Sequence, residues 1–374
     1  LALPLFKTAL EANPKIEQFW LSYIDALIKE QQFEAAKQVI EQAKKQGVKE
    51  KKLNSLKAQL LPIPQAENVN NISPSQQQLS NLLEHYQNGR FCEAEKLAVS
   101  ITEQFPRHNF SWKILGAVLK QTGRVSEAVF AGEKAIEITP DDAEAHSNLG
   151  VMLQELGRLE EAEATLMQAI TLKPDYAEAH YNLGVMLQEL SRLDEAEASY
   201  RQVILLKPDY TQAHSNLGNV LQELGRLEEA ETSYTQAIVL RPDYADAHCN
   251  LGTMLEEMGR LDEAEACYRI AISLKPDLVG AYSNLGNTLK ELGKLEEAEA
   301  SYRQAIVLKS NFSEAHINLG NTLKELGRLE DAEASYIQAI VLEPDYAVGH
   351  SNLAITLQEL GRLDEAEASC RQAI

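Results

Sequence analysis

The residue pattern with the clearest chemical potential is a column of asparagines, here called the ladder asparagines. They recur every 34 residues at Asn148, Asn182, Asn216, Asn250, Asn284, Asn318 and Asn352. A side-chain amide offers two N–H donors and a carbonyl acceptor, so it can pair with both polar groups of a peptide bond. Amides repeated along one surface could therefore hold the backbone of an extended polypeptide with little regard to its sequence. They can equally form hydrogen bonds inside the repeat, and both interpretations stay open.

A second column consists of six of the eight histidines. Its members are His146, His180, His214, His248, His316 and His350. Helices in stacked repeats lie roughly 9–10 Å apart, whereas zinc needs its ligands about 2 Å away. Two such histidines therefore cannot share one ion. Trp112 and Tyr282 occupy the same place in other repeats, which favours a packing role, and we expect no metal site.

No arrangement of residues predicts catalysis. Acidic pairs such as Glu160–Glu161 recur in repeat after repeat, as catalytic groups normally do not. Each glycine stands alone at a turn or contact, so there is no glycine-rich phosphate loop. A tyrosine column indicates packing between helices, at Tyr200, Tyr234, Tyr268, Tyr302 and Tyr336. We expect a protein that is not an enzyme, has no catalytic residues and needs no cofactor.

The charge balance limits the classes of partner. The formal net charge of the 374 residues is −21 at pH 7, and nucleic-acid binding needs a basic surface. No uncharged apolar run is long enough to span a bilayer. We therefore expect no nucleic-acid and no membrane partner. The cysteines are widely spread without a C-x-x-C pair, which fits a reducing compartment, and we expect a cytoplasmic protein.

The elements that must position these columns follow from the unit 143–176. Leu149, Met152 and Leu153 share one face of a first helix, and the apolar residues after Leu159 share one face of a second. Gly157 supplies the stop between them, and a proline ends the unit because it cannot continue a helix. Each pair of helices exposes an apolar face that only a neighbouring pair can cover.

The 34-residue period with Asn-Leu-Gly in the first helix resembles the tetratricopeptide-repeat family. The resemblance implies an all-α fold, a right-handed superhelix in which antiparallel helix pairs form an α-solenoid. It also implies that the ladder asparagines face the concave wall. The ladder is similar to that of the repeat domain of O-linked N-acetylglucosamine transferases, where it holds protein substrates. No part of the chain resembles their catalytic domain.

The repeats divide the chain into four parts. Residues 1–50 are expected to hold degenerate N-terminal units, and 51–74 an extra helix and a proline-containing linker. Residues 75–142 fit two further degenerate units, and 143–374 form a regular array of six full units and a truncated last one. The position of Gly157 is taken by Ser191 in the second regular unit, which weakens that turn if positive φ is needed.

These patterns support three hypotheses of function. The first is a non-catalytic scaffold that binds an extended, neutral to basic polypeptide through the ladder, since columns of glutamate and glutamine flank it. The second is a substrate-recruiting repeat arm of a larger enzyme such as a glycosyltransferase. The third is a self-associating or filament-forming protein that uses exposed repeat ends, where Leu357, Leu360 and Leu363 are expected to form an uncovered apolar surface.

Overall fold

The structure, a computed structural model, describes residues 16–29, 32–48 and 73–373, together with single positions at 10, 13, 52, 53, 56 and 57. Every regular element in these residues is an α-helix. In the segment 51–74, which is expected to hold an extra helix and a proline-containing linker, only positions 52, 53, 56, 57, 73 and 74 are described, so both stay predictions. The chain forms two compact units, 1–140 and 141–374. The four-part division made from the sequence is likewise still a prediction.

The first unit holds the degenerate repeats. Its described helices are α2 (Glu17–Lys29), α3 (Phe33–Lys45), α5 (Gln76–Gln87), α6 (Phe91–Gln104), α7 (Asn109–Gln121) and α8 (Val125–Ile138). Helix α2 packs on α3, α5 on α6, and α7 on α8. Trp20, Ile24 and Ile40 belong to the core of the first pair. Degenerate sequence therefore still produces paired helices, because the apolar faces are retained.

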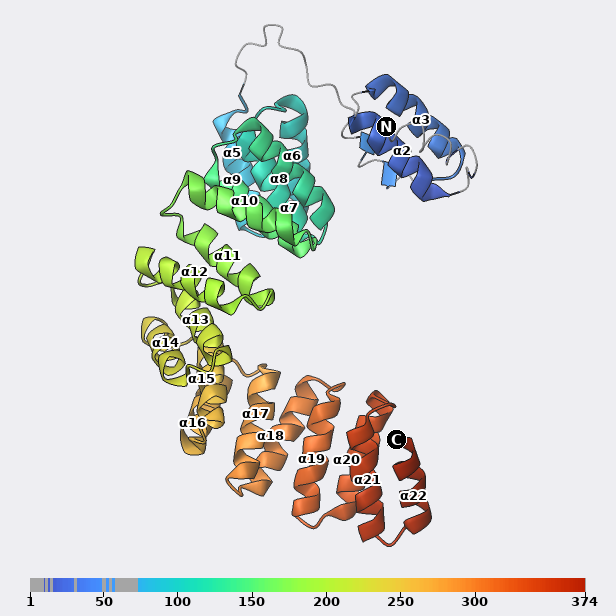
Figure 1. Ribbon diagram of the computed structural model, residues 1–374, viewed down its shortest axis with the longest axis vertical. Coiled ribbons are helices and arrows are strands. Elements are labelled where there is room, and N and C mark those ends of the chain that lie inside the picture. The colour runs from blue at the N-terminus through green and yellow to red at the C-terminus, as the bar shows by residue number, and fades with distance from the viewer. Residues whose placement is uncertain are drawn as a thin grey trace. The chain divides into compact units, whose positions relative to one another are not determined.

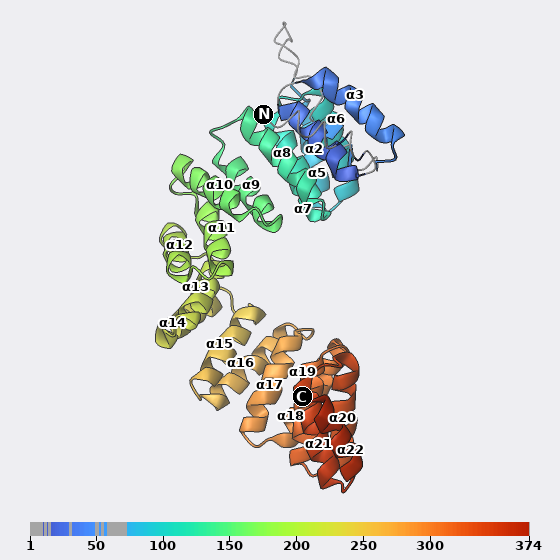
Figure 2. The ribbon, with the colours of Figure 1, turned by 45° about the vertical axis from the view of Figure 1, so that its right-hand side comes forward.

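The second unit is an uninterrupted series of helix pairs, each made of a first and a second helix. The bounds are α9 (Ala143–Glu155), α10 (Leu159–Leu172), α11 (Ala177–Glu189), α12 (Leu193–Leu206), α13 (Thr211–Glu223), α14 (Leu227–Leu240), α15 (Ala245–Glu257), α16 (Leu261–Leu274), α17 (Val279–Glu291), α18 (Leu295–Leu308), α19 (Ser313–Glu325), α20 (Leu329–Leu342), α21 (Ala347–Glu359) and α22 (Leu363–Gln372). These pairs follow one another in sequence order (Figures 1 and 2). The predicted solenoid of antiparallel helix pairs is confirmed.

The turn inside each pair depends on a residue with positive φ. Gly157 has a φ of 78°, and the N–H of Arg158 donates to the Leu153 carbonyl at 2.9 Å. This bond satisfies a carbonyl that the end of the helix would leave unpaired. Ser191 occupies the same turn in the next repeat with a φ of 56°, and it is the one non-glycine residue with positive φ in the described chain.

Glycine lets the two helices of a pair approach closely. A Cβ atom built on Gly218 would lie 2.6 Å from Cε1 of Tyr234, closer than atoms can pack. The tyrosines of this column are fully buried, which confirms that they pack between helices. In the first regular repeat Leu166 replaces the tyrosine, and Gly150 meets that side chain in the same way.

The pattern of contacts gives the second unit its curvature. Consecutive first helices touch one another, as α11 touches α13 and α13 touches α15. Contacts between consecutive second helices are weaker or absent in this unit. The first helices therefore lie on the inner side of the curve, as the family resemblance implies for the ladder.

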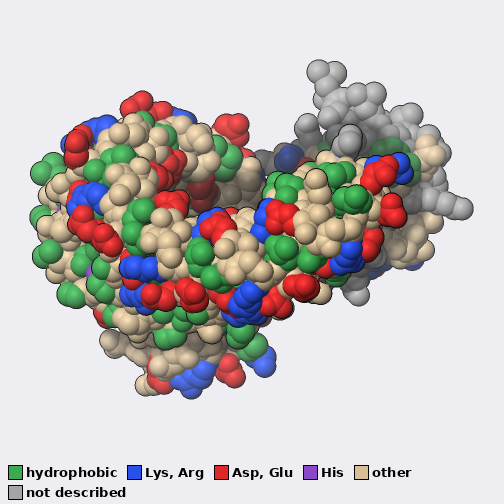
Figure 3. Space-filling model, turned by 90° about the horizontal axis from the view of Figure 1, so that it is seen from below, with side chains coloured by type: hydrophobic (Ala, Val, Ile, Leu, Met, Phe, Trp, Pro, Cys, Tyr) green, Lys and Arg blue, Asp and Glu red, His purple; other side chains and the backbone are tan. Residues whose placement is uncertain are grey.

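Ion pairs join the second helices of neighbouring repeats. The Arg226 guanidinium donates to Glu229 in its own helix and to Glu197 of the preceding repeat, at 2.6–2.8 Å. The side chain of Glu197 is only 13% exposed. Arg192, Arg260 and Arg328 make equivalent bonds. Acidic and basic side chains are accordingly interspersed over the surface in Figure 3, so the excess of acid is partly neutralised locally.

One expectation about the last repeat is wrong. Leu357 is 3% exposed and belongs to the core, because α22 covers it. Leu360 is half-buried, while Leu363 is 64% exposed. The three leucines therefore do not form one uncovered apolar surface. The last helix, although short, is long enough to cover the inward face of its partner.

Candidate functional site

The ladder asparagines lie half-buried on the inner helices, and most of them form a hydrogen bond to the preceding repeat. Asn182 Nδ2 donates to Ser147 at 3.1 Å, and Asn216 Nδ2 donates to the Tyr181 hydroxyl at 3.1 Å. The next four members repeat this connection. One amide hydrogen is therefore used inside the array, while the carbonyl oxygen Oδ1 of these residues accepts no bond from the described chain.

The acceptors in the later repeats form a second asparagine column, namely Asn219, Asn287 and Asn321. Asn219 Oδ1 accepts from Asn250 Nδ2 at 2.9 Å and from the Tyr234 hydroxyl at 2.8 Å. Asn287 and Asn321 accept from the next ladder asparagine and from their own tyrosine in the same way. The sequence analysis missed this column. The signal was present, since each member lies three residues after a ladder asparagine.

The glutamine and glutamate columns near the ends of the first helices pair with each other. Gln154 Nε2 donates to Glu189 at 2.6 Å, and Gln222 Nε2 donates to Glu257 at 2.7 Å. Further along, lysine replaces glutamine, and Lys324 lies 3.2 Å from Glu359. Each link joins two adjacent repeats on the inner side. Taken together, the two columns are therefore acidic in the earlier repeats and closer to neutral in the repeats that carry lysine.

Glu256 breaks this succession. It stands where other repeats have glutamine or lysine, and the glutamate of the next repeat is Glu291. Its Oε2 accepts a hydrogen bond from the Tyr268 hydroxyl at 2.8 Å. Burial is the main reason why the pKa of Glu256 is raised, and the charges of Glu291 and Glu257 add to the effect. One junction in the array thus holds a like-charge contact where its neighbours hold an attractive one.

The histidine column has a structural role. Nε2 of His214 lies 2.9 Å from the carbonyl oxygen of Pro208, and His248 is 3.0 Å from that of Pro242. Trp112, at the same place in the first unit, donates its indole N–H to the Pro106 carbonyl at 2.9 Å. A carbonyl can only accept, so the histidine must carry its proton on Nε2. These side chains tie a helix to the loop before it.

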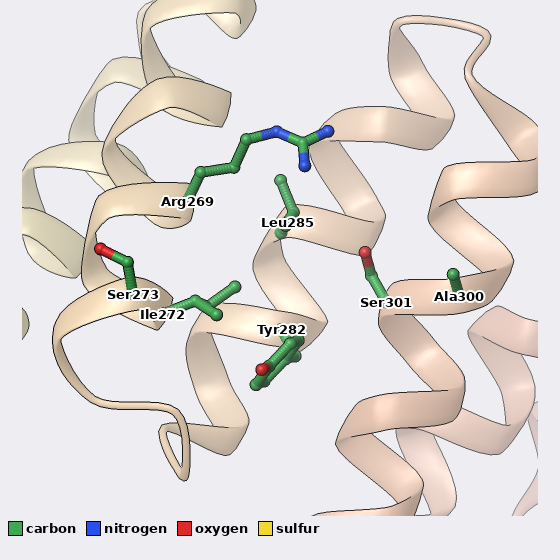
Figure 4. Close-up of a pocket in the computed structure, with 7 residues that line it drawn as sticks. All are labelled: Arg269, Ile272, Ser273, Tyr282, Leu285, Ala300 and Ser301. Atoms are coloured by element: carbon green, nitrogen blue, oxygen red, sulfur yellow. The ribbon is translucent and has the colours of Figure 1, made fainter.

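A hollow lies between α16, α17 and α18, and its lining residues do not include a ladder asparagine. It has a volume of about 330 Å³, and Figure 4 shows Arg269 above Leu285 with Tyr282 at the other end. Arg269 is already paired with Glu265 and Glu297. Ser273 and Ser301 donate their hydroxyls to backbone carbonyls of their own helices. Three of its polar side chains, those of Arg269, Ser273 and Ser301, are therefore already bonded within the protein.

Among the described residues, no helix combines the length and the apolar character that crossing a bilayer requires. No three His, Cys, Asp or Glu side chains in the described ranges converge as metal ligands would.

Family models for this type of repeat match nearly the whole chain. A model described as TPR repeat matches residues 152–191, 218–259, 286–327 and 320–361. Models described as tetratricopeptide repeat match 177–210 and 245–278, 1–60, 131–164, 351–374 and 81–143. The matches include the degenerate N-terminal segment as well as the regular array. No curated protein matches the chain.

Solved structures match the chain at low sequence identity, and those with a TM-score of 0.50 or more share its fold. A chain of the APC/C hetero-tetramer Cut9-Hcn1 matches with a TM-score of 0.55 at 16% identity, over 76% of this chain and 56% of that one. PilF of Pseudomonas aeruginosa matches with a TM-score of 0.50 at 20% identity, over 59% of this chain and 96% of that one. YrrB, described as a TPR protein with an unusual peptide-binding site, has a TM-score of 0.43 at 23% identity, over 49% of this chain and 95% of that one.

Proposed function

Because the chain belongs to the tetratricopeptide-repeat family, we propose that it is a non-catalytic protein-interaction scaffold whose ladder face binds an extended polypeptide. The observation that carries the proposal is the set of ladder Oδ1 atoms left without a partner in the described chain. Free amide oxygens in a row on the inner helices match the N–H groups of an extended backbone. A tightly packed structural network would have used them.

The charge of the inner face favours a neutral to basic ligand. Glu155, Glu189, Glu223 and Glu257 all lie at the ends of first helices on this side. Lys290 and Lys324 are each paired with a glutamate of the next repeat, so they offer little free positive charge. An acidic peptide would meet repulsion along most of the array.

The test begins with selection of a dodecapeptide from a random library on the wild-type chain. Its affinity is then measured by fluorescence polarisation for the variant Asn250→Ala/Asn318→Ala/Asn352→Ala. One hydrogen bond contributes about 0.5–1.5 kcal/mol, so three lost contacts should weaken binding roughly tenfold or more. The matched control is Gln236→Ala/Gln338→Ala on the exposed side of the second helices.

Two results would contradict the proposal. One is an affinity that is equal in the ladder variant and the wild type. The other is an affinity that does not change when backbone amides of the peptide are N-methylated, since methylation removes the donors that the ladder would accept. Circular dichroism of each variant should confirm that the helical content is retained.

The remaining hypotheses stay predictions. They are the resemblance of the ladder to that of O-linked N-acetylglucosamine transferases, the recruiting arm of a larger enzyme, self-association, the cytoplasmic location and the exclusion of nucleic acid.

A further inference from the structure

We propose that a polypeptide backbone is bound by pairs of asparagines across repeat junctions, and not by single ladder asparagines. The pairs are Asn219–Asn250, Asn287–Asn318 and Asn321–Asn352. This inference rests on the proposed function and specifies which atoms would perform it. It also concentrates recognition in the segment from α13 to α21.

The internal hydrogen bonds fix the orientation of both amides in a pair. Asn287 Oδ1 accepts from the Tyr302 hydroxyl at 2.7 Å and from Asn318 Nδ2 at 3.2 Å. A carbonyl oxygen has two lone pairs, so these two bonds saturate it. The amide of Asn287 is therefore held with its oxygen toward the protein core and its Nδ2 group turned away from these donors.

Each pair leaves one complementary set of groups free. Nδ2 of Asn287 and Oδ1 of Asn318 have no partner in the described residues, and both side chains are half-buried. They belong to two amides that are joined by a hydrogen bond of 3.2 Å, so both groups are carried by one linked pair of side chains. A free N–H donor beside a free carbonyl acceptor matches the C=O and N–H of a polypeptide backbone.

A neutral backbone suits the surroundings of these pairs better than an anion does. Lys290 and Lys324 project from the same helices as Asn287 and Asn321, and each is neutralised by the glutamate of the next repeat. The like charges of Glu256 and Glu291 in the same segment disfavour an anion further. An uncharged backbone in extended conformation, which exposes its amides, is the occupant that this chemistry fits.

One junction of the chain provides a natural control. Thr253 replaces the second-column asparagine there, and its Oγ1 still accepts from Asn284 at 3.3 Å. It also lies 3.2 Å from the Tyr268 hydroxyl, whose proton goes to Glu256 at 2.8 Å. The proton of Thr253 goes to the Cys249 carbonyl at 3.2 Å. Threonine therefore keeps the bond from the ladder asparagine and the contact with the tyrosine but presents no outward amide donor. This junction therefore keeps the helix packing and lacks the amide N–H that would bind the backbone.

The experiment uses this difference and the dodecapeptide selected on the wild-type chain. Asn219→Thr/Asn287→Thr/Asn321→Thr keeps the bond from each ladder asparagine and should bind the fluorescein-labelled peptide at least about tenfold more weakly, since each lost contact amounts to roughly two- to tenfold. Thr253→Asn creates a fourth pair and should tighten binding by about twofold or more. Urea unfolding midpoints should remain close to that of the wild type.

The outcomes separate this inference from the proposed function. Binding that is lost in the ladder variant but unchanged in the threonine variant overturns the pair and leaves the scaffold proposal standing. Failure to select any peptide, or binding insensitive to both variants, overturns both. If the triple threonine variant does not fold, Thr253→Asn alone tests the inference. A peptide affinity that does not rise in this variant contradicts binding by asparagine pairs.

Discussion

Glu256 shows how one side chain changes a repeated contact. At the same place Gln154, Gln188 and Gln222 donate to a glutamate of the next repeat, whereas Glu256 brings a second negative charge toward Glu291. Half-burial then makes the carboxylate form costly. The groups that face it are Tyr268 of α16, Thr288 and Glu291 of α17, and Glu257 of its own helix.

Replacing Glu256 by glutamine should therefore stabilise the protein at pH 7. The new Nε2 can donate to Glu291, and the like-charge contact disappears, so we expect a gain of a few tenths to about 1 kcal/mol. Because the pKa of Glu256 is raised in the folded state, its protonation favours folding as the pH falls, and the ionised form is the costly one.

The gain from Glu256→Gln should consequently shrink as the pH falls toward and below the ordinary pKa of glutamate. Urea unfolding of variant and wild type at pH 7 and pH 4 measures this difference. Glu223→Gln is a suitable control, because Glu223 already accepts from Gln188 at 3.0 Å and its replacement should not stabilise. A gain for Glu256→Gln that is equal at both pH values would show that ionisation of this carboxyl is not the cause.

Close approach at Gly218 is a second single-residue effect. Gly218→Ala places a methyl group against the ring of Tyr234, and we expect a loss of about 1–3 kcal/mol. The last repeat contains Ala354 and carries the smaller Cys370 where other repeats have tyrosine. In a Tyr234→Cys background, Gly218→Ala should therefore cost little. Thermal or urea unfolding of the two single variants and the double variant gives the coupling, and strictly additive losses would contradict the contact.

At the scale of the element, the turn between α11 and α12 is the exceptional one. The equivalent turns in the regular array have glycine, and their φ lies between 72° and 78°. Ser191 adopts a φ of 56°, a conformation that strains a residue with a Cβ. The surrounding hydrogen bonds, including Arg192 N–H to the Leu187 carbonyl at 2.9 Å, hold it there.

Ser191→Gly should therefore stabilise the array by about 0.5–1 kcal/mol, since relief of the strain outweighs the added freedom of glycine in the unfolded chain. The reciprocal change Gly225→Ser is expected to destabilise by a similar amount, although the space around Gly225 is open. Urea unfolding midpoints measure both changes. A lower midpoint for Ser191→Gly would indicate that the serine is not strained.

At the scale of the whole molecule, the second unit is organised along one dimension. Each helix contacts its immediate neighbours in sequence and, for the first helices, the next first helix. Among the described helices of this unit, no extensive contact joins distant repeats. Stability is then close to a sum of repeat and interface contributions, and a repeat is a removable module.

Deletion of residues 211–244 should therefore leave a folded array. The cut removes α13 and α14 and joins Tyr210 to Ala245. The new boundary therefore has the same two residue types as the natural boundary between Tyr244 and Ala245. Circular dichroism should show unchanged helicity per residue, with a modestly lower urea midpoint. Deletion of 211–226 removes only the first helix and its turn, so it should expose apolar faces and cause aggregation. Equal behaviour of the two deletions would contradict the modular picture.

The sequence alone determined the repeat period, the helix pairs and the turn residues, whereas the face of the ladder came only from the resemblance to tetratricopeptide repeats. These features depend on local chemistry, such as the apolar spacing around Leu149 or the positive φ that Gly157 allows, and they recur in every copy. The packing role of His214 and Tyr234 was also predictable, because neither a shared metal nor catalysis fits a spacing of one repeat.

Only the tertiary structure decided which polar atoms remain available. Asn250 and Asn219 belong to different repeats, and their hydrogen bond forms only when stacking brings α13 beside α15. The pairing of α21 with α22 buries Leu357, and the stacking of repeats sets Glu256 against Glu291. Periodicity assigns a side chain to a face, but the partners of its donors and acceptors depend on the neighbouring helix. The spacing of the second asparagine column is visible in the sequence, whereas its hydrogen bonds appeared only in three dimensions.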